Sequence, residues 1–84
     1  MSGGKQVTLA RMRAGQSGMV LRIEGGHVLV NRLNSLGIIP GKRITKISSM
    51  LMRGPVTIEV NRAQIAVGLG MASKIIVELD KVTE

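Results

Sequence analysis

The sequence predicts a mainly β fold: a small β-barrel of five or six short strands with one short α-helix. Apolar residues recur in short, β-branched runs between glycine-containing breaks, which is the pattern of short strands. One stretch, residues 29–36, has helical spacing instead. The chain has 84 residues, enough for one domain with a modest core. So many strands in so short a chain favour a closed or half-closed barrel.

We expect a single domain over residues 7–80, with a flexible N-terminal tail at 1–6 and a C-terminal tail at 81–84. The chain begins with Met-Ser-Gly-Gly, which offers almost nothing to bury. The sequence shows no linker, internal repeat or low-complexity segment. The whole fold must therefore be built within this one domain.

The first long strand is expected over "SGMVLRI", residues 17–23. In this strand Met19, Leu21 and Ile23 would share one face, and Val20 would lie on the other. Apolar residues on both faces indicate a strongly curved strand, as in a small barrel. The "EGG" that follows ends the strand.

The one helix is predicted by three leucines. Leu29, Leu33 and Leu36 fall at i, i+4 and i+7, which places them in one helical stripe. Gly37 follows directly and suits the left-handed C′ position that ends many helices. Pro40-Gly41 then predicts a type II turn, because proline presets φ and glycine accepts a positive φ.

The next strand is expected over "KRITKISSM", and "LMRGP" connects it to the one after. "VTIEV" alternates cleanly, so Val56, Ile58 and Val60 are expected to point inward. Asn61-Arg62 then turns the chain into a short strand around Ile65 and Val67, which predicts a hairpin.

The last part of the sequence closes the fold. "GLGMAS" is expected to form a short turn or a single helical turn. "KIIVEL" is expected to be the final strand and to place three apolar residues on one face: Ile75, Val77 and Leu79.

The chain is strongly basic. Twelve Lys and Arg against five Asp and Glu give a formal net charge of +7. Such an excess favours an anionic partner, which could be nucleic acid, a lipid surface or an acidic protein face. Solubility alone explains it equally well, because a small domain commonly carries a net charge of about 2 to 8. The basic residues are spread from Lys5 to Lys81 without forming a block, which argues against a nucleic-acid-binding tail.

The composition excludes several classes of protein. The chain has no cysteine and no aromatic residue, so it is not a disulfide scaffold and its core must be aliphatic. Its longest uncharged stretch, residues 63–73, is shorter than the roughly 20 residues that cross a bilayer. The N-terminus lacks the apolar segment of a signal peptide. We therefore expect a soluble, intracellular protein.

We expect no catalytic residues and no enzymatic activity. The only histidine is His27, and no serine has an evident base beside it. "GLGMAS" lacks the lysine and the length of a phosphate-binding loop, and "EGGH" is only a turn.

A metal site has weak candidates in Glu24 and His27, which are close in sequence and could form half a site. The alternative, which we favour, is that His27 is an exposed residue at the start of the helix. We therefore expect no required cofactor, and any binding of Fe²⁺ or Zn²⁺ would be weak or transient.

Nucleic acid is a second class of partner. The chain has no aromatic ring on which to stack bases, which is how most single-strand readers bind. Binding through the phosphate backbone alone would use seven basic residues: Arg11, Arg13, Arg32, Arg43, Lys46, Arg53 and Arg62.

The stretch "SSMLMRGP" is a candidate contact surface. Met50, Leu51 and Met52 lie at or near a loop and are followed by Arg53. Apolar residues at a loop tip either cap the barrel or contact a partner. Methionine is adaptable and common at contact surfaces. Capping is the commoner outcome, and the hypothesis of a contact surface stays open beside it.

Taken together, several segments resemble the FeoA family of ferrous iron uptake. These segments are "GMVLRIEGG", "LVNRLNSLGIIPGKRI", "RGPVTIEVNRAQIAVG" and "ASKIIVEL". The resemblance covers roughly residues 7–80. Its most specific part is the motif Arg-Leu-x-x-Leu-Gly-x-x-Pro-Gly. The motif residues with a structural role are Leu33, Leu36, Gly37, Pro40, Gly41, Gly54 and Pro55.

This resemblance implies an SH3-like barrel, a cytoplasmic location and a regulatory, non-enzymatic role beside FeoB, a membrane permease with a cytosolic GTP-binding domain. It implies no catalytic residues and no small-molecule substrate. The candidate partner-contact residues are Arg32, Arg43, Met50, Leu51, Met52 and Arg53. Two alternatives remain: a small basic barrel that binds nucleic acid, and the SH3-like regulatory module of iron-dependent repressors.

Overall fold

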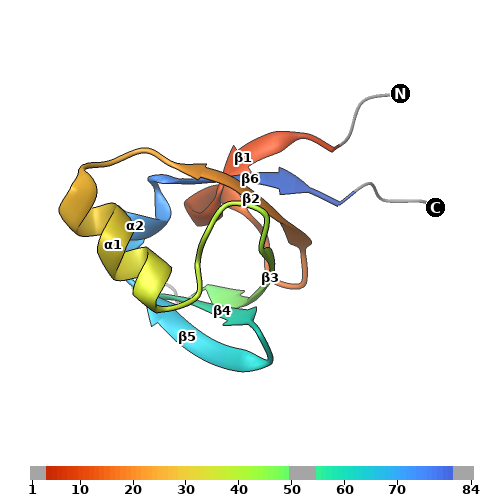
Figure 1. Ribbon diagram of the computed structural model, residues 1–84. Helices are drawn as coiled ribbons and strands as arrows, with labels where there is room; N and C mark the ends of the chain where they lie inside the picture. Colours follow the sequence, from red (N-terminus) through yellow and green to blue (C-terminus); the bar gives the residue numbers. More distant parts are fainter. Residues whose placement is uncertain (1–3, 50–54, 81–84) are drawn as a thin grey trace.

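The computed structural model describes residues 4–49 and 55–80. Its elements follow one another along the chain as β1 (Gln6–Thr8), η1 (Leu9–Arg11), β2 (Ser17–Ile23), α1 (His27–Ser35), β3 (Arg43–Ser49), β4 (Val56–Val60), β5 (Ala63–Val67), α2 (Leu69–Ala72) and β6 (Ile75–Leu79). The six strands form one sheet in the order β1-β6-β2-β3-β4-β5, and every neighbouring pair is antiparallel. The sheet bends around the core, and α1 and α2 are both found toward the same end of the barrel (Figure 1). The predicted mainly β class, with six short strands and one helix of more than a single turn, is confirmed.

The second half of the chain folds as its pattern predicts. Val56, Ile58 and Val60 of β4 are all buried. The two-residue Asn61-Arg62 turn joins β4 to β5, with Val60 paired to Ala63. The expected helical turn in "GLGMAS" is α2, and β6 buries Ile75 and Val77 completely.

The first long strand differs from the prediction. Val20 of β2 is buried, whereas Met19, which we placed on the main apolar face, is 42% exposed. The pairing of β2 with β6 shifts register between Val20 and Arg22. A bulge of this kind adds a residue and reverses the alternation. Val20 and Ile23 can therefore both contact the core from one strand.

Helix α1 ends as the sequence indicates. Gly37 has a φ of +93°, and its N–H donates to the carbonyl of Asn34. The next N–H, of Ile38, donates to the carbonyl of Leu33, which completes a Schellman motif. Gly41 has a φ of +91°, and the Lys42 N–H donates to the Ile39 carbonyl, as expected for the predicted turn.

The leucine stripe of α1 is only partly buried. Leu33 is fully buried and Leu29 is half-buried. Leu36, the last leucine of the predicted stripe, is the C-cap residue and stays 39% exposed. Ile38, the residue after the Schellman glycine, is buried in its stead and packs into the core together with Leu33.

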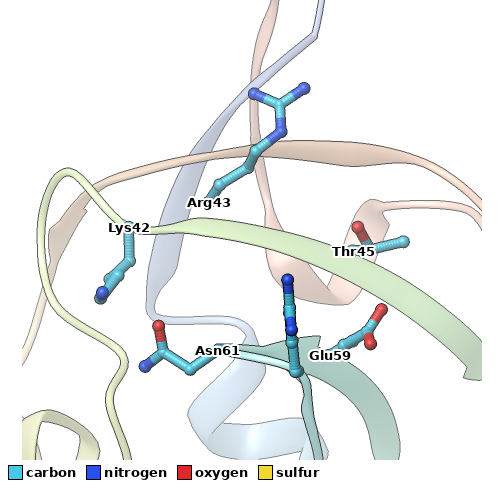
Figure 2. Close-up of a pocket in the computed structure, with 6 residues that line it drawn as sticks. Lys42, Arg43, Thr45, Glu59 and Asn61 are labelled. Atoms are coloured by element: carbon cyan, nitrogen blue, oxygen red, sulfur yellow. The ribbon is translucent and has the colours of Figure 1, made fainter.

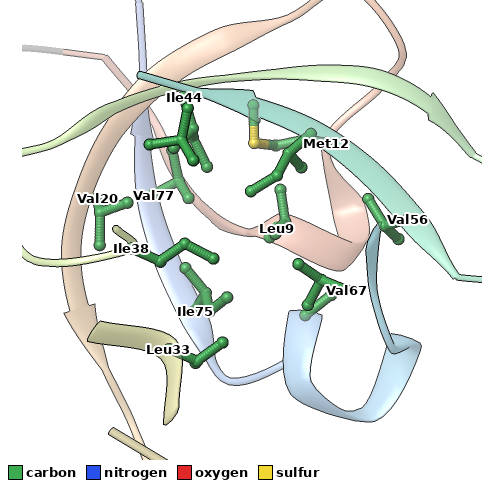
Figure 3. Close-up of a cluster of buried hydrophobic side chains, with 13 residues drawn as sticks. Leu9, Met12, Val20, Leu33, Ile38, Ile44, Val56, Val67, Ile75 and Val77 are labelled. Carbon is green, nitrogen blue, oxygen red and sulfur yellow. The ribbon is translucent and has the colours of Figure 1, made fainter. Parts of the chain in front are cut away.

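The core is entirely aliphatic within the described residues, as the composition requires (Figure 3). It consists of Leu9, Met12, Val20, Leu33, Ile38, Ile44, Val56, Ile58, Val60, Val67, Ala72, Ile75 and Val77. Gly18 lets β2 approach β6 closely. A Cβ at this position would lie 2.5 Å from the Glu78 carbonyl oxygen and 2.6 Å from Val77 Cγ1.

The N-terminal boundary lies earlier than we expected. We assigned residues 1–6 to a flexible tail, but Gln6 begins β1 and pairs with Glu78. The Leu79 N–H also donates to the Lys5 carbonyl. The 3-10 turn η1, which the sequence pattern did not predict, follows β1 and buries Leu9. The C-terminal tail at 81–84 lies outside the described residues.

Candidate functional site

The predicted contact residues are only partly described by the structure. Arg32 is exposed on α1, and Arg43 is exposed as the first residue of β3. Met50, Leu51, Met52 and Arg53, together with the motif residue Gly54, lie outside the described residues.

A basic groove lies at the end of the sheet where β3 begins and β4 ends (Figure 2). Its volume is about 440 Å³, and it is lined by Lys42, Arg43, Thr45, Glu59, Asn61 and Arg62. Thr45 of β3 is directly opposite Glu59 of β4, so their side chains share the outer face of the sheet. Arg32 is not part of its lining, so the two described arginines of the predicted set do not form one site.

The turn that follows β4 supplies two of the residues that line this groove, Asn61 and Arg62. Asn61 and Arg62 have positive φ values of 54° and 65°, the conformation of a type I′ hairpin turn. Asn61 tolerates this region, whereas arginine adopts it less readily. The end of α1 lies close to this turn, because a Cβ on Gly37 would lie 3.0 Å from Asn61 Nδ2. The predicted helix end therefore lies beside a side chain that lines the groove.

The groove carries more positive than negative charge. Lys42, Arg43 and Arg62 contribute cations and Glu59 the only carboxylate of the lining. Arg43 already has an ion-pair partner, because its guanidinium donates to Asp80. In Figure 2 its side chain extends away from Lys42, Thr45, Glu59 and Asn61. Lys42 and Arg62 form no ion pair with any described residue. These two cations are therefore available to an anionic group.

Lys46 is not a surface residue, although we counted it among the cations for nucleic acid. Its exposed fraction is only 1%. Its Nζ donates to the carbonyls of Leu9 at 3.2 Å and Ala10 at 3.3 Å, and also to that of Met12. Burial lowers the pKa of Lys46 from its ordinary value of 10.5. Strand alternation could have revealed this inward position, because Lys46 is two residues after the buried Ile44.

Glu24 and His27, the weak metal candidates, do not form part of a larger ligand cluster. Arg22 Nε donates to Glu24 Oε2 at 2.9 Å. His27 is the exposed first residue of α1. Over residues 4–49 and 55–80, no three His, Cys, Asp or Glu side chains are grouped so that they could hold a metal ion.

A family model, a curated relative and a solved structure all point to the same family. A sequence model described as the FeoA domain matches residues 7–79. A protein of Methanocaldococcus jannaschii with the provisional name Fe(2+) transport protein A is 37% identical over 70 residues, or 83% of either chain. A crystal structure described as the iron uptake regulatory protein FeoA is 36% identical, with a TM-score of 0.84. The match covers 89% of this chain and 99% of that one.

More distant structures share the fold alone. The FeoA of Stenotrophomonas maltophilia, described as complexed with zinc and as an SH3 domain protein, has a TM-score of 0.74 at 20% identity. The match covers 86% of this chain and 89% of that one. A manganese-dependent transcriptional repressor has a TM-score of 0.83 at 21% identity. The match covers 94% of this chain but only 44% of the repressor.

The fold thus defines a small SH3-like barrel, with an open, basic groove on its surface. The chain belongs to the FeoA family, whose members are small accessory proteins of ferrous iron transport and not a known family of enzymes. None of the described helices is both long and apolar enough to span a bilayer.

Proposed function

We propose that this protein is a cytoplasmic, non-enzymatic regulator of ferrous iron transport that contacts the cytosolic part of a FeoB-type permease. Membership of the FeoA family supports the transport role. The observation that carries the contact is the groove with Lys42 and Arg62, two cations that have no ion-pair partner among the described residues. We propose that these cations meet carboxylates of the permease, with Arg32 and residues 50–53 as further contacts.

The proposal requires an electrostatic contribution to binding. Exposed charge pairs are screened over about 8 Å at physiological ionic strength, so added salt must weaken the complex. Charge at the edge of an interface acts mainly on the association rate and the salt dependence of binding. The net charge of +7 acts in the same direction as the local cations.

The test is an NMR titration of the full chain, isotopically labelled, with the cytosolic part of the permease at two salt concentrations. We expect shifts concentrated at Lys42, Arg43, Asn61 and Arg62, and weaker binding in high salt. Lys42→Glu should weaken binding roughly tenfold, a loss of about 1.4 kcal/mol.

The matched control is Lys74→Glu, which makes the same charge change at an exposed residue that does not line the groove. Equal losses for both variants would indicate a general charge effect and contradict the assignment of the groove. No binding by the unmodified chain would reject the contact with the permease altogether.

The second class of function, binding of nucleic acid, has less support. Lys46 is buried and Arg43 is paired with Asp80, so two of the seven candidate cations are not free to bind phosphates. A gel-shift assay at physiological salt distinguishes the two classes, because the proposed function predicts no retarded band.

A further inference from the structure

Strand β5 is the last strand of the sheet, and its outer edge is unpaired among the described residues. It pairs with β4 over five residues without a register shift. At about 3.3 Å per residue, this edge is roughly 17 Å long. In Figure 1 it lies at the border of the sheet farthest from β1.

The Asn61-Arg62 turn determines which backbone groups of β5 are free. In a two-residue type I′ hairpin, the flanking residues Val60 and Ala63 form a hydrogen-bonded pair. Antiparallel ladders alternate, so Ala63, Ile65 and Val67 direct their N–H and C=O groups toward β4. The same groups of Gln64 and Ala66 point away from β4. No described loop or cap forms a backbone hydrogen bond with them.

Natural sheets usually protect such an edge with charge, proline, a bulge or short length. The opposite edge of this sheet is short, because β1 has three residues before η1 begins. The sequence of β5, Ala-Gln-Ile-Ala-Val, contains no charge and no proline. Gln64 and Ala66 are exposed, and Ile65 is half-buried. Strand β5 therefore has none of the protection that the other edge has.

The charge around this edge indicates what kind of chain would bind there. The basic groove adjoins the end of β5, because Arg62 both lines the groove and immediately precedes the strand. A second copy of this chain would bring its own net charge of +7 to a basic surface, which disfavours self-pairing. An extended segment with carboxylates at one end would instead complement both the free edge of β5 and the basic groove.

We propose that the partner binds by strand addition: an extended, acidic segment pairs with the free edge of β5 and places its carboxylates beside Lys42 and Arg62. The main-chain groups of Gln64 and Ala66 provide the pairing, and the half-buried Ile65 favours an apolar residue opposite it. This inference rests on the proposed function for the identity of the partner, and it adds the mode of contact.

The first test is amide-resolved hydrogen exchange of the full chain, alone and with the cytosolic part of the permease. In the free protein the amides of Gln64 and Ala66 should exchange rapidly, whereas those of Ala63, Ile65 and Val67 should be protected. The complex should slow exchange at Gln64 and Ala66 by at least roughly tenfold. Rapid exchange at both amides in a complex that otherwise forms would overturn strand addition and leave the proposed function intact.

The second test uses a proline at the edge. Ala66→Pro removes an N–H that points away from β4, a position where edge strands tolerate proline. It should weaken binding roughly tenfold by removing one intermolecular hydrogen bond, whereas the matched Ala66→Ser should bind normally. If Ala66→Pro fails to fold, the exchange experiment alone decides. Protection of Gln64 and Ala66 in the protein alone, together with a dimeric mass, would show that a second copy occupies the edge and overturn the proposal.

Discussion

Lys46 is the only charged side chain that is buried in the described part of the chain. Its ammonium donates hydrogen bonds to the carbonyls of Leu9, Ala10 and Met12, which lie in η1 or directly after it. Its backbone adds two bonds to the loop after η1, because its carbonyl accepts from the Gly15 N–H and its own N–H donates to the Gln16 carbonyl. One lysine therefore attaches residues 9–16 to the middle of the sheet.

Lys46→Met should destabilise the fold. Methionine keeps the length of the side chain but removes the ammonium that donates to three carbonyls. The Leu9 carbonyl still accepts from the Met12 N–H, whereas those of Ala10 and Met12 lose their side-chain donor, and an unsatisfied buried group costs about 1–3 kcal/mol. Urea denaturation would measure the loss in the free energy of unfolding. The control, Lys74→Met at an exposed position, should stay within about 0.5 kcal/mol of the unmodified chain. A Lys46→Met variant as stable as this control would show that the carbonyls are satisfied without the lysine.

The pH dependence of stability follows from the lowered pKa of Lys46. Its folded-state pKa lies below the unfolded value of 10.5, so between these two values the unfolded chain binds more protons than the folded chain. The contribution of this group to stability therefore rises with pH across that window. The Lys46→Met variant should lack this rise when denaturation is measured at increasing pH up to 10.5. Identical pH profiles for the two proteins would contradict the lowered pKa.

At the scale of elements, the end of α1 is where sequence and structure agree best. Glycine was required at position 37 because the Schellman motif needs a positive φ, and this chemistry is local. The alternation of β4 was equally predictable, because one of its faces is buried throughout. The bulge in β2 and the turn η1 were not, since each depends on contacts with residues far away in the sequence.

Gly37→Val should destabilise the protein by about 1–2 kcal/mol, because an L-residue with a side chain resists the left-handed conformation. The new Cβ would also crowd Asn61 Nδ2 at 3.0 Å. Thermal denaturation would measure the effect. Gly70→Val is the matched control, because a Cβ added there would meet no atom within 4 Å and its φ is not positive. Equal melting temperatures for the two variants would show that the helix end tolerates a side chain.

The groove shows what a single sequence cannot indicate. Arg43 is one of the predicted contact residues, and it also lines the groove. Its partner Asp80 lies 37 residues away, and nothing local indicates that pairing. Arg62 was treated only as one cation among several. The antiparallel pairing of β3 with β4, with Thr45 opposite Glu59, brings the start of β3 and the end of β4 together, so that Lys42 and Arg62 line the same groove. The sequence shows how many basic residues the chain has, but the topology of the sheet determines which of them lie together in the groove.

At the scale of the whole molecule, metal affinity should be low. A cation at His27 must compete with Arg22 for Glu24, since Arg22 Nε lies 2.9 Å from Glu24 Oε2. In an NMR titration with Zn²⁺, we expect shifts near His27 that do not saturate at one equivalent, and that His27→Ala abolishes. Arg22→Ala should strengthen binding by releasing the carboxylate. Saturation at one equivalent in the unmodified chain would show a preformed site instead.

The aliphatic core has a consequence for studying the protein in its complexes. All thirteen buried core residues carry methyl groups, from Leu9 to Val77. The chain has no tryptophan, tyrosine or phenylalanine, so near 280 nm it is almost transparent. Fluorescence of a mixture would therefore report on the partner alone. Methyl resonances would in turn report on the interior of this barrel, even in a complex many times its size.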